Sequence, residues 1–209
     1  GIPMAHLSVY PVHFAGTTIG ILYEDEEVHS FLTFLFADVH TQADSPEPLL
    51  SFHQSGQDYV LTLDEEPQYT GGLGVQCAAV LFDLVIFNLL RANNTGVAVH
   101  AGAVAYHEHD TVILLPGPSG SGKSHMSAWL TAQGCAYLTD ELVFFPQNQP
   151  DQLLAFARPC CIKSQAVAVI KQLLPLDPPH PLLEDEQGII VPHRTLNPGY
   201  TGISSAPNL

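Results

Sequence analysis

The stretch Gly117-Pro118-Ser119-Gly120-Ser121-Gly122-Lys123-Ser124 decides how the rest of the chain is interpreted. It matches G-x-x-x-x-G-K-[S/T] at every fixed position, which is the pattern of a phosphate-binding loop. Residues 111–115 before it are apolar and rich in β-formers, and they predict a buried strand. Residues 124–133 after it predict a helix, and Gly134 is placed to end that helix. The motif therefore has the strand–turn–helix context that a phosphate-binding loop requires.

The residue types in this loop suit a nucleotide. Glycines let the backbone N–H groups approach phosphate oxygens closely, and the helix directs its positive dipole end to the same place. Lys123 is expected to reach the β- and γ-phosphates, and the Ser124 hydroxyl is expected to bind Mg²⁺. We therefore expect ATP, or another nucleotide, together with Mg²⁺. The expected nucleotide-binding residues of the loop are Gly117, Ser119, Gly120, Ser121, Gly122, Lys123 and Ser124.

Composition limits the class of protein. The chain has 209 residues, of which 46% are hydrophobic and 13% charged, as expected for an ordinary globular protein. Only 6 Lys and Arg stand against 21 Asp and Glu, which gives a formal charge of −15. Such a surface repels nucleic acid and anionic lipid, so we expect neither as a partner.

The cysteines and the apolar runs predict a soluble cytoplasmic protein. The four cysteines form no C-x-x-C pair and no zinc-ligand spacing, so we expect reduced thiols. No secretory signal begins the sequence as given. The longest apolar run, residues 78–90, contains Asp83 and Asn88 and is too short to span a bilayer.

The pattern of residues predicts an α/β protein with a smaller α/β region at residues 1–96 and a phosphate-loop domain at 97–209. Prolines forbid regular helix through most of the tail after residue 174. Before residue 97 we expect a hairpin within 7–23, a helix from 24 to 36, strands at 49–54 and 58–63, and a buried helix at 75–92. After it we expect strands at 97–106, 136–139, 142–145 and 153–158, and a helix at 164–174.

The acid pair Asp140-Glu141 is the second candidate feature, because it interrupts the apolar strand residues at 136–145. Carboxylates in such a place are costly unless they pair with a cation. Nucleotide-bound Mg²⁺ supplies one when it is held between the loop hydroxyl and a strand-end Asp. The alternative is an exposed β-turn whose carboxylates are solvated.

Three segments together resemble the HPr kinase/phosphorylase family: His100-Ala101-Gly102-Ala103-Val104, the glycine-rich loop, and Tyr137-Leu138-Thr139-Asp140-Glu141. The sequence is more similar still to the HPr-kinase-like branch, which includes kinases of small molecules and modified peptides. The resemblance covers residues 97 to about 165. It implies a P-loop core with a mixed β-sheet, related to phosphoenolpyruvate carboxykinase, and phosphorylation of a serine hydroxyl.

The resemblance also implies roles for individual residues. Asp140 would be the base that accepts the hydroxyl proton, or the Mg²⁺ ligand, and Glu141 stands where the family has a second Asp. His100 would lie near the reacting phosphate; alternatively, it is a strand histidine hydrogen-bonded in the core. Arg158 and Lys163 would bind the γ-phosphate or an acidic substrate; alternatively, they are isolated surface cations.

Some features depart from the family pattern. His125 follows Ser124 where bacterial HPr kinases carry Glu, which argues against HPr as the substrate. The family's later glycine-rich loop is not found. We expect ATP/Mg²⁺-dependent phosphoryl transfer to a hydroxyl of a protein, peptide or small molecule. The alternatives are an inactive nucleotide-binding regulatory or assembly module and a protein with an accidental motif. Because HPr kinases form hexamers, a homo-oligomer is also open.

Overall fold

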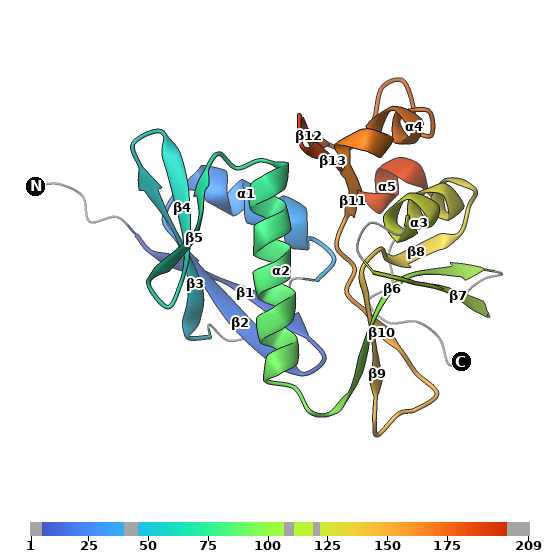
Figure 1. Ribbon diagram of the computed structural model, residues 1–209, viewed down its shortest axis with the longest axis horizontal. Helices are drawn as coiled ribbons and strands as arrows, with labels where there is room; N and C mark the ends of the chain where they lie inside the picture. Colours follow the sequence, from blue (N-terminus) through green and yellow to red (C-terminus); the bar gives the residue numbers. More distant parts are fainter. Residues whose placement is uncertain (1–5, 40–45, 107–110, 119–121, 200–209) are drawn as a thin grey trace, which may run out of the picture. The chain divides into compact units, whose positions relative to one another are not determined.

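Three β-sheets and their helices make up this mixed α/β protein in the computed structural model, which describes residues 6–39, 46–106, 111–118 and 122–199 (Figure 1). Backbone contacts divide the chain into two units, Gly1–Asn93 and Asn94–Leu209. No helix in the described ranges has both the length and the apolar character needed to cross a membrane.

The first unit holds one five-stranded sheet. Its strands follow in the order β1 (Ser8–Phe14), β2 (Thr17–Tyr23), β3 (Pro48–Ser55), β4 (Asp58–Leu63) and β5 (Glu66–Gly71). Neighbouring strands are antiparallel except for the parallel pair β2–β3. The hairpin and the next two strands expected from the sequence are confirmed. Strand β5 was not expected, because its sequence EPQYTG is polar and its side chains are exposed or half-buried.

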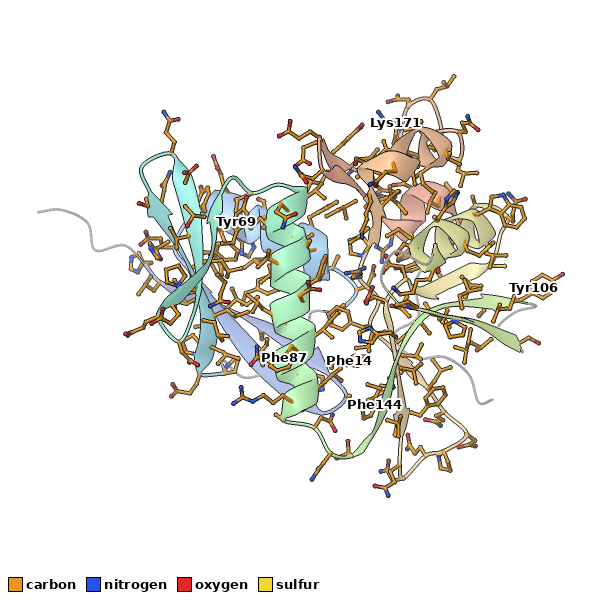
Figure 2. The ribbon with its side chains drawn as sticks, in the orientation of Figure 1. Phe14, Tyr69, Phe87, Tyr106, Phe144 and Lys171 are labelled. Carbon is orange, nitrogen blue, oxygen red and sulfur yellow. The ribbon has the colours of Figure 1, made fainter. Side chains whose placement is uncertain are left out.

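Two helices accompany this sheet: α1 (Glu26–Phe36), capped by the Asp25 carboxylate, and α2 (Val75–Arg91). Helix α2 contacts β1, β2 and β5, which lie toward opposite edges of the sheet. The sheet therefore curls around α2 as a half-barrel (Figure 1). The expectation that α2 is buried is only partly right, because Phe87 on this helix is 62% exposed (Figure 2).

The second unit is built on the long strand β6 (Gly96–Tyr106). Strand β7 (Thr111–Pro116) pairs with one edge of β6, and β8 (Ala136–Thr139) and β9 (Leu142–Pro146) follow one another along the other edge. Strand β10 is only Leu154–Ala155, shorter than the strand expected at 153–158, and it pairs with β9. All these pairs are antiparallel. The expected mixed sheet is therefore wrong for the described strands of this unit, and the parallel pair lies in the first unit.

Strand β7, which leads into the glycine-rich loop, differs from its prediction. It pairs only with β6 among the described strands, and its side chains are exposed or half-buried. The prediction of a buried strand was wrong because an apolar run fixes strand propensity but not the number of neighbouring strands.

A third sheet lies in the region after Arg158. It consists of β11 (Cys160–Lys163), β13 (Gly188–Val191) and β12 (Leu183–Asp185), in that order. Its apolar side chains pack with Ala128 of helix α3 (Lys123–Ala132) and with Tyr137 of β8. The helix expected at 164–174 is a 3₁₀ turn, η1 (Ser164–Ala166), followed by α4 (Val167–Lys171), and a short helix α5 (His193–Leu196) follows β13.

Candidate functional site

The first turn of α3 begins directly after a glycine with an unusual backbone. Gly122 is the N-cap with φ +88°, in the left-handed region that glycine adopts at little cost. Its carbonyl accepts the Met126 N–H at 2.9 Å. Gly117, after β7, donates its N–H to the His100 carbonyl at 3.3 Å. The predicted site residues Ser119, Gly120 and Ser121 lie outside the described residues. At one end of the loop, Gly117 follows β7 and is hydrogen-bonded to β6. At the other end, Gly122 leads directly into α3.

Close packing against β6 fixes the position of α3. The Ser127 hydroxyl, which is fully buried, donates to the Lys123 carbonyl at 2.7 Å. A Cβ atom at Gly102 of β6 would lie 2.3 Å from the Ser127 hydroxyl oxygen. Only a residue without a side chain therefore lets the helix approach the strand this closely.

Asp140 is fully buried at the break between β8 and β9. Its Oδ1 accepts the Arg158 Nε–H at 2.6 Å. Its Oδ2 accepts from the Ser124 hydroxyl at 2.8 Å, from the Cys161 N–H at 2.9 Å and from the second Arg158 nitrogen at 3.3 Å. A carboxylate has about four acceptor positions, so these donors satisfy it. Asp140 joins α3, the β8–β9 break and β11.

Glu141 follows with a different environment. Its Oε2 lies 3.3 Å from the Lys123 Nζ and 3.2 Å from an Arg158 nitrogen, and its Oε1 lies 3.1 Å from the His100 Nδ1. The side chain of Glu141 is 17% exposed and that of Lys123 4%, whereas His100 is 66% exposed. One partly exposed carboxylate therefore meets three basic side chains.

The turn that presents both acids is stabilised locally. The Thr139 hydroxyl accepts the N–H groups of Glu141 at 3.0 Å and Leu142 at 3.2 Å. The Glu141 carbonyl accepts the Ala101 N–H at 3.0 Å, so the ladder with β6 continues across the break. These bonds pair the N–H groups of Glu141 and Leu142 and the Glu141 carbonyl at the point where the two carboxylates leave the strand.

Arg158 is the cation that compensates Asp140. Burial is the strongest single influence and acts to lower the pKa of its guanidinium, but the charges around it, that of Asp140 first, and the hydrogen bond to Asp140 together outweigh burial and raise that pKa. The Arg158 carbonyl accepts the Tyr137 hydroxyl at 2.5 Å. Burial, and then the Asp140 charge, raise the pKa of Tyr137, which keeps this hydroxyl protonated as a donor. Arg158 is thus held through both its backbone and its side chain.

The structure brings together six of the residues singled out in the sequence. His100, Lys123, Ser124, Asp140, Glu141 and Arg158 form one connected network. Lys163 is exposed at the end of β11. The exposed-turn alternative is wrong for Asp140, which is buried, and the core-histidine alternative is wrong for His100, which is exposed.

Two contributions were not predicted. The Thr139 hydroxyl organises the turn, and its position directly before the acid pair was a signal that could have been used. The Cys161 N–H reaches Asp140 through the backbone of a strand whose pairing the sequence does not reveal.

The oxygen ligands suit Mg²⁺ better than a transition metal. The Ser124 hydroxyl and the Asp140 carboxylate are 2.8 Å apart at the start of α3. Mg²⁺ is bound by one or two such ligands together with substrate phosphates and water. Among the described residues no group of three or more His, Cys, Asp or Glu could hold a metal by itself. These residues fit a cation that arrives with a phosphate.

No protein-family model, no curated protein and no solved structure matches this chain.

Proposed function

We propose that this chain is a kinase that transfers the γ-phosphoryl group of ATP, with Mg²⁺, to a hydroxyl group. Serine in a protein, a peptide or free form is the acceptor that the resemblance to HPr-kinase-like proteins favours. The observation that carries the proposal is that consecutive residues of the loop engage consecutive acids. Ser124 contacts Asp140 at 2.8 Å, and Lys123 contacts Glu141 at 3.3 Å.

In this proposal the start of α3 binds the donor. Its free N–H groups and Lys123 bind the phosphates, because both present positive charge at one place. If the Ser124 hydroxyl gave up its hydrogen bond to Asp140, these two oxygen ligands would hold Mg²⁺, which would neutralise phosphate charge. Arg158 holds the Asp140 carboxylate in place. It also contacts Glu141, so its positive charge lies near the phosphates that would bind there.

The geometry favours Glu141 over Asp140 as the base. Asp140 is buried and its acceptor positions are occupied, whereas Glu141 is partly exposed and is hydrogen-bonded to His100. The acceptor oxygen would attack the γ-phosphorus while the bond from that phosphorus to the β-phosphate oxygen breaks. The hydroxyl proton passes to the Glu141 carboxylate, and ADP leaves.

An inactive nucleotide-binding module is the second candidate, and the saturation of Asp140 by protein donors favours it. Isothermal titration with ATP and Mg²⁺, followed by transfer of labelled phosphate to free serine and to serine peptides, separates the two. Binding with transfer supports the kinase, and binding without transfer supports the module. No binding contradicts both.

A further inference from the structure

We propose that Glu141 makes this site selective for phosphate that arrives complexed with a divalent cation. In this view the Glu141 carboxylate is an internal anion that occupies Lys123 until such a complex displaces it. The inference rests on the proposed nucleotide site and adds a specificity-determining residue to it.

Basic groups from separate segments converge on the Glu141 carboxylate. Lys123 and Arg158 share the Oε2 atom of Glu141, and His100 contacts Oε1. These groups come from the start of α3, from the segment before β11 and from β6. Donors from three separate segments surround Glu141 in the way that they would surround a bound anion.

Binding of metal-free phosphate beside Lys123 would be electrostatically costly. The Lys123 side chain is 4% exposed, so water screens its attraction to Glu141 only weakly. A bare phosphate chain that takes Lys123 leaves the Glu141 carboxylate with less compensation and places more negative charge beside it. The buried Asp140 carboxylate adds to this repulsion.

A divalent cation removes that cost when it arrives with the phosphate. The cation supplies positive charge for the acid pair at the moment when Lys123 turns to the phosphate, so no carboxylate loses its compensation. Binding of the cation and binding of the phosphate therefore become coupled, and each raises the affinity for the other by the same factor.

The test is the metal dependence of ATP affinity in Glu141→Gln. Isothermal titration would measure ATP binding to the wild type and the variant, once with EDTA and once with excess Mg²⁺. Glu184→Gln is the matched control, because it makes the same chemical change in an acid that pairs with Lys171 at 2.6 Å. Figure 2 labels Lys171 on α4.

We expect E141Q to bind metal-free ATP about tenfold more tightly than the wild type, within the usual range of coupling between sites. The gain in affinity from Mg²⁺ should shrink by the same factor, and E184Q should behave as the wild type. Circular dichroism would check that the variants fold. If E141Q does not fold, E141D replaces it, because its shorter side chain withdraws from Lys123 and should shift both values in the same direction.

This inference would be overturned if E141Q bound metal-free ATP no more tightly than the wild type does. That holds for any effect of Mg²⁺ on the ATP affinity of the wild type. A wild type that fails to bind ATP with Mg²⁺ would instead overturn the proposed function, and the inference would fall with it.

Discussion

Asp140 and Arg158 form a buried ion pair that holds three segments of the second unit together. Two hydrogen bonds join their side chains, and the Ser124 hydroxyl and Cys161 N–H add the connections to α3 and β11. Removing one partner of such a pair leaves an uncompensated buried charge, which costs far more than the intact pair contributes. Loss of one partner alone should therefore destabilise this unit as well as disturb the proposed chemistry.

We expect Arg158→Ala to lower the free energy of unfolding by about 3 to 5 kcal/mol, because Asp140 would be left buried without its cation. Urea unfolding would measure this, followed by fluorescence of Trp129, the single tryptophan, which lies in α3. Arg91→Ala is the control, since Arg91 is exposed at the end of α2. Equal stability of R158A and R91A would contradict the assigned role of Arg158.

Cys77 gives a pH-dependent prediction in the first unit. Burial raises the pKa of its thiol from 9.0 to about 12. Between these values the unfolded chain has lost the thiol proton and the folded chain keeps it, so stability is complete below about pH 9 and falls as pH rises toward 12. In Cys77→Ala the free energy of unfolding should fall less steeply with rising pH, and the difference in slope should correspond to about one proton. Urea unfolding followed by circular dichroism at pH 8 to about 11 tests this, and an unchanged slope would count against it.

Among the elements, the packing of α3 against β6 places Lys123 and Ser124 beside the acid pair Asp140-Glu141. The contact depends on Gly102, where an added Cβ would lie 2.3 Å from the Ser127 hydroxyl oxygen and 3.3 Å from the Lys123 carbonyl. A clash at this position would push the first turn of α3 away from β6, and the effect would reach the site.

Gly102→Ala should therefore cost about 1 to 3 kcal/mol of stability, as overpacking usually does, and should weaken ATP binding. Adding Ser127→Ala removes the nearest atom and should restore most of both losses. Gly72→Ala is the control, because no atom lies within 4 Å of a Cβ there. Urea unfolding and isothermal titration of the three variants measure the effects. A double variant no better than G102A would show that this close contact is not the cause.

Local patterns predicted the elements whose features lie within a few residues of one another. The helix α1 with its acidic first turn, the hairpin β1–β2, and α3 with Gly134 after it follow from caps, turns and periodicity. The break between β8 and β9 was also visible, because two adjacent acids interrupt apolar strands. These signals are local, so the sequence carries them directly.

Features that depend on distant partners were missed or wrong. Strand β7 has an apolar sequence but lies at a sheet edge, and β13 pairs with β11 across a proline-rich segment. In the site, the sequence indicated these six residues and placed Ser124 and Asp140 together around Mg²⁺, but it did not indicate which cation pairs with which acid. That Arg158 saturates Asp140 and leaves Glu141 as the partly exposed acid follows only from the tertiary structure.

At the scale of the whole molecule, charge is distributed unevenly. The formal charge is −15, and Arg91 is the single lysine or arginine before position 94. Phosphate must approach against this field, while the nearby cations Lys123 and Arg158 are already paired with acids. Long-range electrostatics should therefore oppose nucleotide association, and salt should screen that opposition.

We expect the association rate constant for ATP with Mg²⁺ to rise about two- to threefold when KCl increases from roughly 20 to roughly 200 mM. Stopped-flow fluorescence with a labelled ATP would measure it. A rate that falls with salt would mean that local cations dominate the approach of the nucleotide.

The start of α3 is proposed to bind a nucleotide through Lys123. Isothermal titration of ATP with Mg²⁺ against the wild type, Lys123→Ala and Lys171→Ala tests it most directly, since Lys171 is an exposed lysine paired with Glu184. We expect saturable binding by the wild type and K171A, and at least about tenfold weaker binding by K123A, the loss expected for one charged hydrogen-bond donor. Full ATP affinity in K123A, or no binding by the wild type, would contradict it.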